Sequence, residues 1–283
     1  MDMRTPKVLL EGIVFPEGPR WHDGKLWFSD MHGGKVMTVD PDGRSATVVA
    51  IPERPSGLGF DRSGNLLIVS MGDRRLVRLR GGALETVADL APFVGGDPND
   101  MVVDGQGRAY IGNFGFDLFG GGSPRPTNLL VVAPHGGVRV VADEVSFPNG
   151  TVITPDGKTL IVAETFAGVL TAFNVKPDGS LSGRRFFAHL GDRQPDGICL
   201  DAEGAVWASC FGQDEFVRVH EGGEIADRVA VTGRRAVACM LGGEDRKTLF
   251  LLTAETSVED LAQGKSKGRI ETVRVDVPGA GYP

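Results

Sequence analysis

The sequence predicts an all-β chain folded as a six-bladed β-propeller, and three observations lead to this fold. One phrase recurs six times: an apolar run, a turn of the form D-x-x-G or a close variant, and a second apolar run that ends in small or polar residues. The copies lie about 40–50 residues apart, the spacing typical of four-stranded propeller blades. Sustained helical periodicity is absent apart from a single turn at residues 258–263.

The six copies account for almost the whole chain, so we expect residues 1–283 to form a single domain. They are GPRWHDGKLWFSD from residue 18, GLGFDRSGNLLIVS from 57, DMVVDGQGRAYIGN from 100, GTVITPDGKTLIVAE from 150, GICLDAEGAVWASC from 197 and AVACMLGGEDRKTLFLLTAE from 236. Each copy predicts two strands joined by a turn whose glycine can adopt positive φ. Runs such as LLIV at residues 66–69 are apolar throughout, as strands buried between neighbouring blades must be.

The two ends of the chain predict how the ring closes. The last clear strand of the sixth copy covers residues 269–275, which leaves that blade without an outer strand. Residues 7–10 (KVLL) are apolar and precede the first copy. We expect them to complete the last blade, because this removes an exposed sheet edge.

Composition limits the classes of partner. The net charge is −7, and Lys and Arg form no run longer than a pair, so the basic footprint of a nucleic-acid-binding protein is missing. No apolar stretch is long enough to span a membrane, and the first residues lack the apolar core of a signal peptide. We therefore expect a cytoplasmic monomer or dimer that acts on a small molecule and binds neither nucleic acid nor membranes. Cys199, Cys210 and Cys239 show no CxxC spacing and are expected to be buried free thiols.

The positions that lead into the innermost strands carry the strongest functional signal. Loops between propeller blades open on one face, and the entry positions are Glu17, Ser56, Asn99, Asn149, Asp196 and Arg235. Four of these six offer hard oxygen ligands, with no His or Cys among them, a set typical of Ca²⁺, Mg²⁺ or Mn²⁺ sites. The alternative for any single Asn-Gly or Asp-Gly pair is ordinary turn chemistry.

We expect these four side chains to hold one divalent cation at the mouth of the channel. The predicted ligands are Glu17, Asn99, Asn149 and Asp196. Ca²⁺ is the first expectation, and Mg²⁺, Mn²⁺, Zn²⁺ and Fe²⁺ are the alternatives.

Four segments resemble those of the gluconolactonase, senescence marker protein and regucalcin family. They are PEGPRW from residue 16, PND from 98, FPNG from 147 and PDGICLDAEGAVW from 195. The resemblance covers essentially the whole chain and implies a metal-dependent lactonase. It implies that Glu17, Asn149 and Asp196 bind the cation directly and that Asn99 binds it, directly or through water, and helps to hold the substrate. It also implies that Asp196 is the general base.

One position departs from this pattern. Sugar-lactone members of the family carry an Arg two residues before the Asn-Asp pair, whereas this chain has Asp97 in the segment GGDPND. An acidic side chain cannot replace the donor fork of Arg. The departure therefore argues against an aldonolactone substrate, unless Arg74 or His32 supplies the missing donor.

The loops after the second strand of each copy supply further candidates. Phe114, Phe116, Phe166 and Phe211 are expected to make an apolar pocket around the cation. The predicted substrate-binding residues are Asn99, His32, Asp117 and Phe114. The Gly- and Pro-rich loop at residues 116–126 is either a lid over this pocket or a tolerated surface insertion.

These features predict metal-assisted hydrolysis of a lactone or related ester. The cation would polarise the carbonyl, and Asp196 would take a proton from the attacking water. No G-x-S-x-G elbow is present for a Ser-His-Asp triad. Phosphotriester or other ester hydrolysis, and a non-catalytic calcium-binding propeller, are the alternative functions.

Overall fold

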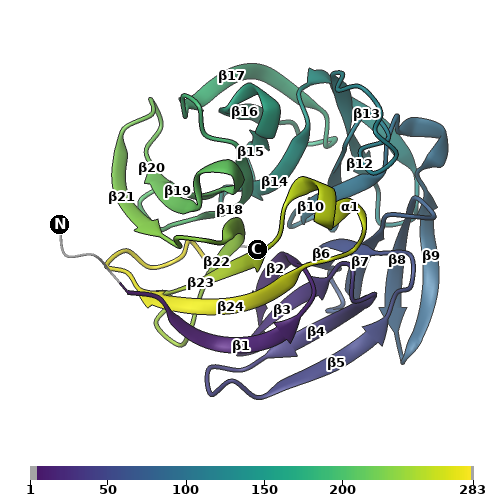
Figure 1. Ribbon diagram of the computed structural model, residues 1–283. Helices are drawn as coiled ribbons and strands as arrows, with labels where there is room; N and C mark the ends of the chain where they lie inside the picture. The colour runs from purple at the N-terminus through teal and green to yellow at the C-terminus, as the bar shows by residue number, and fades with distance from the viewer. Residues whose placement is uncertain (1–4, 282–283) are drawn as a thin grey trace.

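The computed structural model confirms the six-bladed propeller. Six antiparallel sheets of four strands each surround one central axis (Figure 1). The structure describes residues 5–281.

Each of the first five blades is formed by four consecutive strands, innermost first. The first contains β2 (Pro16–His22), β3 (Lys25–Asp30), β4 (Lys35–Val39) and β5 (Ser45–Ala50). The second contains β6 (Pro55–Phe60), β7 (Leu66–Ser70), β8 (Arg75–Arg80) and β9 (Ala83–Asp89). The third contains β10 (Pro98–Val103), β11 (Ala109–Asn113), β12 (Thr127–Val132) and β13 (Val138–Val145). The fourth contains β14 (Pro148–Ile153), β15 (Thr159–Glu164), β16 (Val169–Val175) and β17 (Leu181–His189). The fifth contains β18 (Pro195–Leu200), β19 (Val206–Cys210), β20 (Glu215–Val219) and β21 (Ile225–Ala230).

The sixth blade joins the two ends of the chain, as predicted. From the axis outward it contains β22 (Arg235–Gly242), β23 (Thr248–Glu255), β24 (Lys267–Arg274) and β1 (Lys7–Ile13). Strand β1 pairs antiparallel with β24, with Lys7 opposite Thr272 and Ile13 opposite Gly268. The N-terminal strand thus covers the edge that the C-terminal strands would otherwise expose.

The hydrophobic core is divided among the contacts between neighbouring blades. One cluster joins the first and second blades through Val36, Ile51, Leu58 and Ile68, all buried. Both faces of an inner strand are covered in this way, which explains why the strand sequences are apolar throughout rather than alternating.

The inner strands converge so closely at the axis that a side chain cannot fit at certain positions. A Cβ on Gly57 would lie 2.5 Å from the backbone nitrogen of Met101, in the next blade. A Cβ on Gly150 would lie 2.5 Å from the carbonyl oxygen of Asp196. These glycines therefore permit close packing of strands, rather than a turn.

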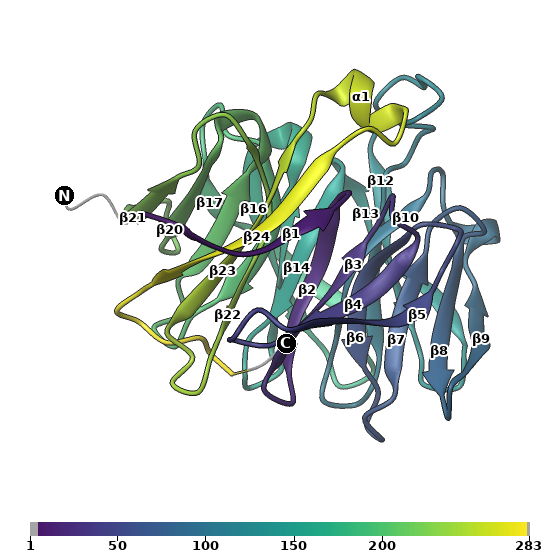
Figure 2. The same cartoon turned by 60° about the horizontal axis from the view of Figure 1, so that its bottom comes forward.

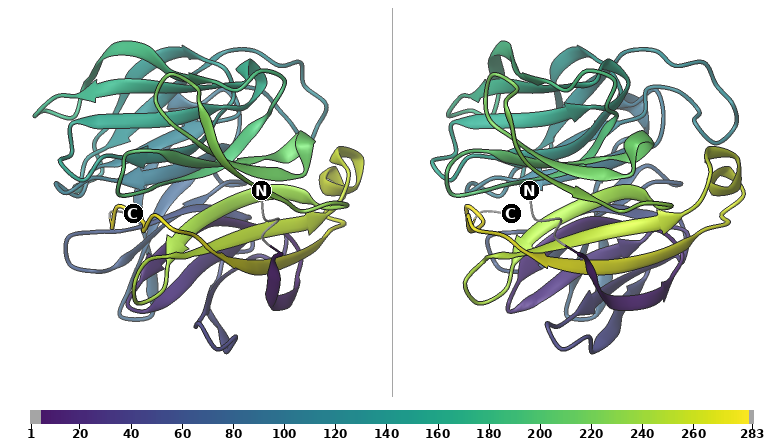
Figure 3. Two further views of the ribbon diagram at one scale, coloured as in Figure 1. Left: turned by 90° about the vertical axis from the view of Figure 1, so that its left-hand side faces the viewer. Right: turned by 60° about the vertical axis from the view of Figure 1, so that its left-hand side comes forward.

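Two segments rise from the same face of the disc (Figures 2 and 3). One is α1 (Val258–Ala262), the single helical turn predicted between β23 and β24, which begins where Ser257 accepts a hydrogen bond from the backbone of Asp260. The other is the long connection between β11 and β12, which includes residues 116–126. Short 3₁₀ turns occur at Ala91–Phe93, Thr165–Ala167 and Phe211–Gln213. Within residues 5–281, no helix is long and apolar enough to cross a membrane.

The ring closure leads to a stability prediction. Ile13 is buried at the end of β1, whereas Val8 in the same strand is 50% exposed. We expect Ile13→Ala to lower the free energy of unfolding by about 2–5 kcal/mol, because it removes buried methyl groups and leaves a cavity. Val8→Ala is the matched control and should change it by less than about 0.5 kcal/mol. Urea denaturation followed by tryptophan fluorescence measures both; equal effects would show that β1 contributes little to closure.

Candidate active site at the mouth of the central channel

The four predicted ligand residues occupy one structural position in four different blades. Glu17, Asn99, Asn149 and Asp196 are each the second residue of an innermost strand, and all four are buried. All four line one cavity at the mouth of the channel. Asn149 and Asp196 therefore lie within β14 and β18, so turn chemistry does not account for their Asn-Gly and Asp-Gly pairs.

The register of the sixth blade changes one expected entry position. Arg235 opposes Ala254 in β23, just as Pro195 opposes Cys210 in the fifth blade. The residue equivalent to Asp196 is therefore Ala236 and not Arg235. Of the six equivalent positions, the second blade contributes a hydroxyl from Ser56 and the sixth contributes only a methyl group.

A chain of hydrogen bonds fixes the amide side chains. The Ser56 hydroxyl donates to Asn99 Oδ1 at 3.0 Å, and Asn99 Nδ2 donates to Asn149 Oδ1 at 2.9 Å. Asn149 Nδ2 in turn donates to the Thr165 hydroxyl at 3.4 Å. These hydrogen bonds link three blades. They orient both amide oxygens and leave the second lone pair of each oxygen free.

The two carboxylates are in an environment that opposes their ionisation. Burial raises the pKa of Glu17 well above its usual range, and the negative charges of Asp196 and Asp100 raise it further. Burial also raises the pKa of Asp196 well above its usual range, followed by the charge of Asp100, while Asn149 lowers it in part. Asp196 Oδ1 is buried and has no hydrogen-bond partner among the described residues.

Of the three carboxylates Glu17, Asp100 and Asp196, only Asp100 has an ion pair among the described residues. Arg20 Nη2 donates to Asp100 Oδ1 at 3.3 Å, and both side chains are buried. Within residues 5–281, neither Glu17 nor Asp196 has such an ion pair. An unpaired buried carboxylate oxygen and two amide oxygens suit a hard divalent cation, which would neutralise the two charges.

The ligand chemistry limits which metal would fit. No group of three or more His, Cys, Asp or Glu side chains in the described part of the chain is placed to hold a metal ion. The four side chains offer two carboxylates and two amides, so the donor set contains only oxygen. Such a set fits Ca²⁺, Mg²⁺ or Mn²⁺ and lacks the nitrogen and sulfur ligands of typical Zn²⁺ sites.

The cavity above these residues is apolar and has a volume of about 190 Å³. Of the Phe residues expected there, Phe114, Phe166 and Phe211 line it, while Phe116 packs behind Phe147 and Phe166. Phe114 stacks on Phe147 with ring centres 4.8 Å apart. The remaining apolar lining is formed by Phe15, Met31, Leu118, Phe119, Phe147, Val258 and Leu261.

The predicted substrate-binding residues occupy different depths of the site. Asn99 and Phe114 line the cavity. His32 lies behind the wall, where the rings of Phe15 and Phe119 meet its imidazole edge-on at 6.2 and 5.8 Å. Burial lowers the pKa of His32, and the charge of Arg54 lowers it further, so the imidazole is neutral at pH 7.

Asp117 does not line the cavity. Its carboxylate accepts a hydrogen bond from the backbone of Gly120 at 2.8 Å, within the long loop of the third blade. This loop nevertheless contributes Leu118 and Phe119 to the cavity wall, and α1 contributes Val258 and Leu261. The two segments that project from this face therefore form part of the cavity wall.

Asp97 has a basic partner that the sequence did not indicate. Arg54 Nη2 lies 2.7 Å from Asp97 Oδ2, and Arg74 Nε lies 3.5 Å from Asp97 Oδ1. Arg54 comes from the loop between the first and second blades. The acidic residue at position 97 therefore has a guanidinium beside it, supplied by the preceding blade.

A second signal in the sequence could have identified more of the wall. Five inner strands begin with proline, at residues 16, 55, 98, 148 and 195. The residues just before three of these prolines, Phe15, Phe147 and Gln194, line the cavity. Because proline fixes where each strand begins, the preceding residue falls at the same level of the channel mouth in every blade.

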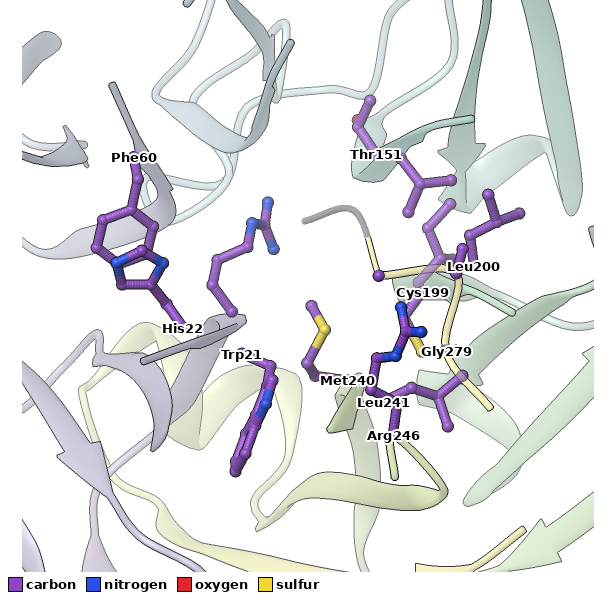
Figure 4. Close-up of a pocket in the computed structure, with 15 residues that line it drawn as sticks. Trp21, His22, Phe60, Thr151, Cys199, Leu200, Met240, Leu241, Arg246 and Gly279 are labelled. Atoms are coloured by element: carbon purple, nitrogen blue, oxygen red, sulfur yellow. The ribbon is translucent and has the colours of Figure 1, made fainter. Parts of the chain in front are cut away.

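The opposite end of the channel contains a larger cavity of about 380 Å³. It is surrounded by the ends of the inner strands and includes Trp21, His22, Met240 and Arg246 (Figure 4). His22 stacks on Phe60 there, with ring centres 3.7 Å apart. No Asp or Glu is among the described residues that line it, so this cavity lacks the oxygen ligands of a cation site.

The amino-acid sequence matches a known protein family. The sequence model of the SMP-30/Gluconolactonase/LRE-like region matches residues 15–255. The 6-deoxy-6-sulfogluconolactonase of Pseudomonas putida is 27% identical over 98% of this chain and 96% of its own length. The L-arabinolactonase of Azospirillum brasilense is 27% identical over 86% of this chain and 82% of its own.

Solved structures show the same fold. A luciferin-regenerating enzyme superimposes with a TM-score of 0.83 at 16% identity and covers 98% of this chain and 97% of its own. The calcium-binding protein regucalcin of Agrobacterium tumefaciens gives a TM-score of 0.78 at 23% identity, with 98% and 97% covered. The chain therefore belongs to the SMP-30/gluconolactonase/LRE-like family.

Proposed function

We propose that this protein is a divalent-cation-dependent lactonase that opens a cyclic ester in the cavity above Asp196. The observation that carries the proposal is the position of Asp196: it is buried, its Oδ1 has no partner among the described residues, and it lies against an apolar cavity that also contains Glu17 and two amide side chains. Relatives named as lactonases support the same reaction class.

The residues fit the steps of lactone hydrolysis. Asp196 takes a proton from water as the water oxygen attacks the carbonyl carbon. The ring C–O bond then breaks, and the proton passes from Asp196 to the leaving oxygen, which yields a hydroxy acid. A divalent cation held by Glu17, Asn99, Asn149 and Asp196 would supply the positive charge that polarises the carbonyl.

The apolar wall has a separate role. The Phe rings surround the reacting ester and exclude bulk water, which strengthens electrostatic interactions inside the cavity. Asn99 is fixed by hydrogen bonds to Ser56 and Asn149, so its side chain is held in place before the substrate arrives.

The ligand assignment gives a direct test. The wild-type protein should bind one Ca²⁺ per chain, and Glu17→Gln and Asp196→Asn should each bind it at least about tenfold more weakly, because affinity follows the charge of the ligand set. Glu53→Gln, which neutralises an exposed carboxylate, is the control and should bind like the wild type. Isothermal titration calorimetry after EDTA treatment measures all four proteins. Unchanged affinity in both ligand variants would contradict the assignment.

The raised pKa values predict how pH affects the cation-free protein. A carboxyl whose pKa is higher in the folded state than in the unfolded state binds protons more tightly when folded. The two carboxyls therefore contribute to the free energy of unfolding in full below the ordinary carboxyl pKa, about 4. This contribution is lost as pH rises through their raised pKa values. In EDTA at pH 8, Asp196→Asn should be more stable than the wild type by about 1–2 kcal/mol.

Calcium should reverse this order. Saturating Ca²⁺ should raise the Tm of the wild type, because it binds only the folded state, and should raise the Tm of Asp196→Asn by less, because the variant binds Ca²⁺ more weakly. Thermal melts at pH 5 and pH 8, with EDTA or Ca²⁺, measure the effect. If pH and Ca²⁺ change the Tm of the wild type no more than they change the Tm of Asp196→Asn, the two buried carboxylates do not control stability in the way proposed here.

The cavity wall predicts which lactones are preferred. A polyhydroxylated lactone would leave hydroxyl groups unpaired against Phe rings, at about 1–3 kcal/mol for each buried group, whereas an alkyl or aryl lactone gains burial. We expect simple alkyl or aryl γ-lactones to show a higher kcat/KM than gluconolactone under identical cation loading. Initial rates by pH-stat, with spontaneous hydrolysis subtracted, provide the comparison. A clear preference for gluconolactone would show that polar groups at the rim dominate substrate choice.

A further inference from the structure

The residues before the strand-opening prolines form a ring at the level of the cavity. Phe15, Phe147 and Gln194 from this ring line the cavity wall. The other two members, Arg54 and Asp97, belong to adjacent blades and form an ion pair with Nη2 and Oδ2 2.7 Å apart. By their position in the repeat, these two charged side chains stand at the rim of the same cavity.

The guanidinium of Arg54 rests against a cavity-lining ring. Its Cζ lies 4.7 Å from the centre of the Phe119 ring, a cation–π contact, and Phe119 lines the cavity. The Arg54 side chain is 28% exposed, so it is held in place yet reachable. A substrate that contacts Phe119 is therefore close to a guanidinium.

Arg54 keeps donors to spare. A guanidinium carries five N–H donors, and among the described residues that of Arg54 makes one hydrogen bond, to Asp97. Asp97 is also approached by Arg74 at 3.5 Å, so two positive side chains share one carboxylate. This leaves one positive charge in the group formed by Arg54, Arg74 and Asp97.

The backbone of Arg54 is unusual. Its φ is +59°, a left-handed conformation that is rare for a residue with a side chain. Phe147, at the equivalent position of the fourth blade, has φ +55° and lines the cavity. Such conformations are strained and concentrate at ligand-binding positions, where they aim a side chain.

We infer that Arg54, held by Asp97 and accompanied by Arg74, is a subsite that binds a carboxylate substituent on the lactone. The inference rests on the proposed function and deepens it. The preferred substrate has an apolar body against the Phe rings, an ester near Asp196 and one carboxylate at the rim beside Arg54. Arg is suited to this task because its fork can bind a carboxylate through two parallel hydrogen bonds.

A pair of matched substrates tests this subsite. One is a γ-butyrolactone whose short alkyl side chain ends in a carboxylate, and the other is the primary amide of that acid. With the Ca²⁺-loaded full-length protein, Arg54→Ala should lower kcat/KM for the carboxylate roughly 10- to 100-fold, mainly through KM, the range for losing a charge-assisted hydrogen bond. Turnover of the amide should change less than about threefold. Arg75→Ala removes a neighbouring exposed guanidinium and is the control.

A second variant, Asp97→Asn, should change KM for the carboxylate substrate in the opposite direction. Asp97→Asn keeps an acceptor for Arg54 but removes the charge that offsets it, so KM for the carboxylate should fall roughly 2- to 5-fold. A purely structural role for the ion pair would instead raise KM in both variants and for both substrates. An unchanged ratio of carboxylate to amide turnover in Arg54→Ala would overturn the inference. Should that variant fail to fold, a higher KM in Asp97→Asn would overturn it.

Binding of a non-hydrolysable analogue separates this inference from the proposed reaction. The γ-lactam with the same carboxylate side chain should bind the Ca²⁺-loaded wild type and lose roughly tenfold or more in Kd with Arg54→Ala. A wild type that opens neither lactone but binds the lactam through Arg54 would contradict the proposed reaction and leave the subsite standing. Equal lactam affinity in the wild type and Arg54→Ala would overturn the subsite.

Discussion

The convergence of six inner strands on one axis is the constraint on which the rest of this molecule depends. At the level of the site the strands approach so closely that Gly57 and Gly150 cannot carry a Cβ without meeting the backbone of the next blade. The residue just before each glycine is brought to the channel mouth by the same geometry. Close packing and the gathering of Glu17, Asn99, Asn149 and Asp196 are therefore two results of one arrangement.

This arrangement places charge where water cannot neutralise it. Glu17 and Asp196 are buried, and the charge of Asp196 raises the pKa of Glu17, while Arg20 pairs with Asp100. A protein optimised for stability alone would place apolar groups at these positions, as the sixth blade does with Ala236. The same unfavourable electrostatics favour the divalent cation that we propose for this site.

The blades share a scaffold but present different side chains at the mouth. The residues before the five prolines are two Phe, one Gln, one Arg and one Asp, so the ion pair at the second and third blades lies between the Phe residues of the first and fourth. The loop of the third blade and α1 of the sixth add Leu118, Phe119, Val258 and Leu261 above them. The repeat thus fixes where side chains stand, and the differences between blades decide what the cavity can bind.

The repeat pattern alone was enough to predict the fold, the closure by residues 7–10 and the level at which the four oxygen-bearing residues lie, because blade repeats and strand patterns are local and recur along the chain. It also predicted Phe114, Phe166 and Phe211 in the cavity wall, since these follow second strands whose ends are readable. Asp97, considered from the sequence alone, indicated that the Arg donor of the sugar-lactone members is missing. Only the tertiary structure brought Arg54 against Asp97 and Phe119, moved Phe116 behind the wall and added α1 to it. Contacts between blades depend on the angle and spacing of packed sheets and on the path of irregular loops, and no periodicity in the sequence encodes these.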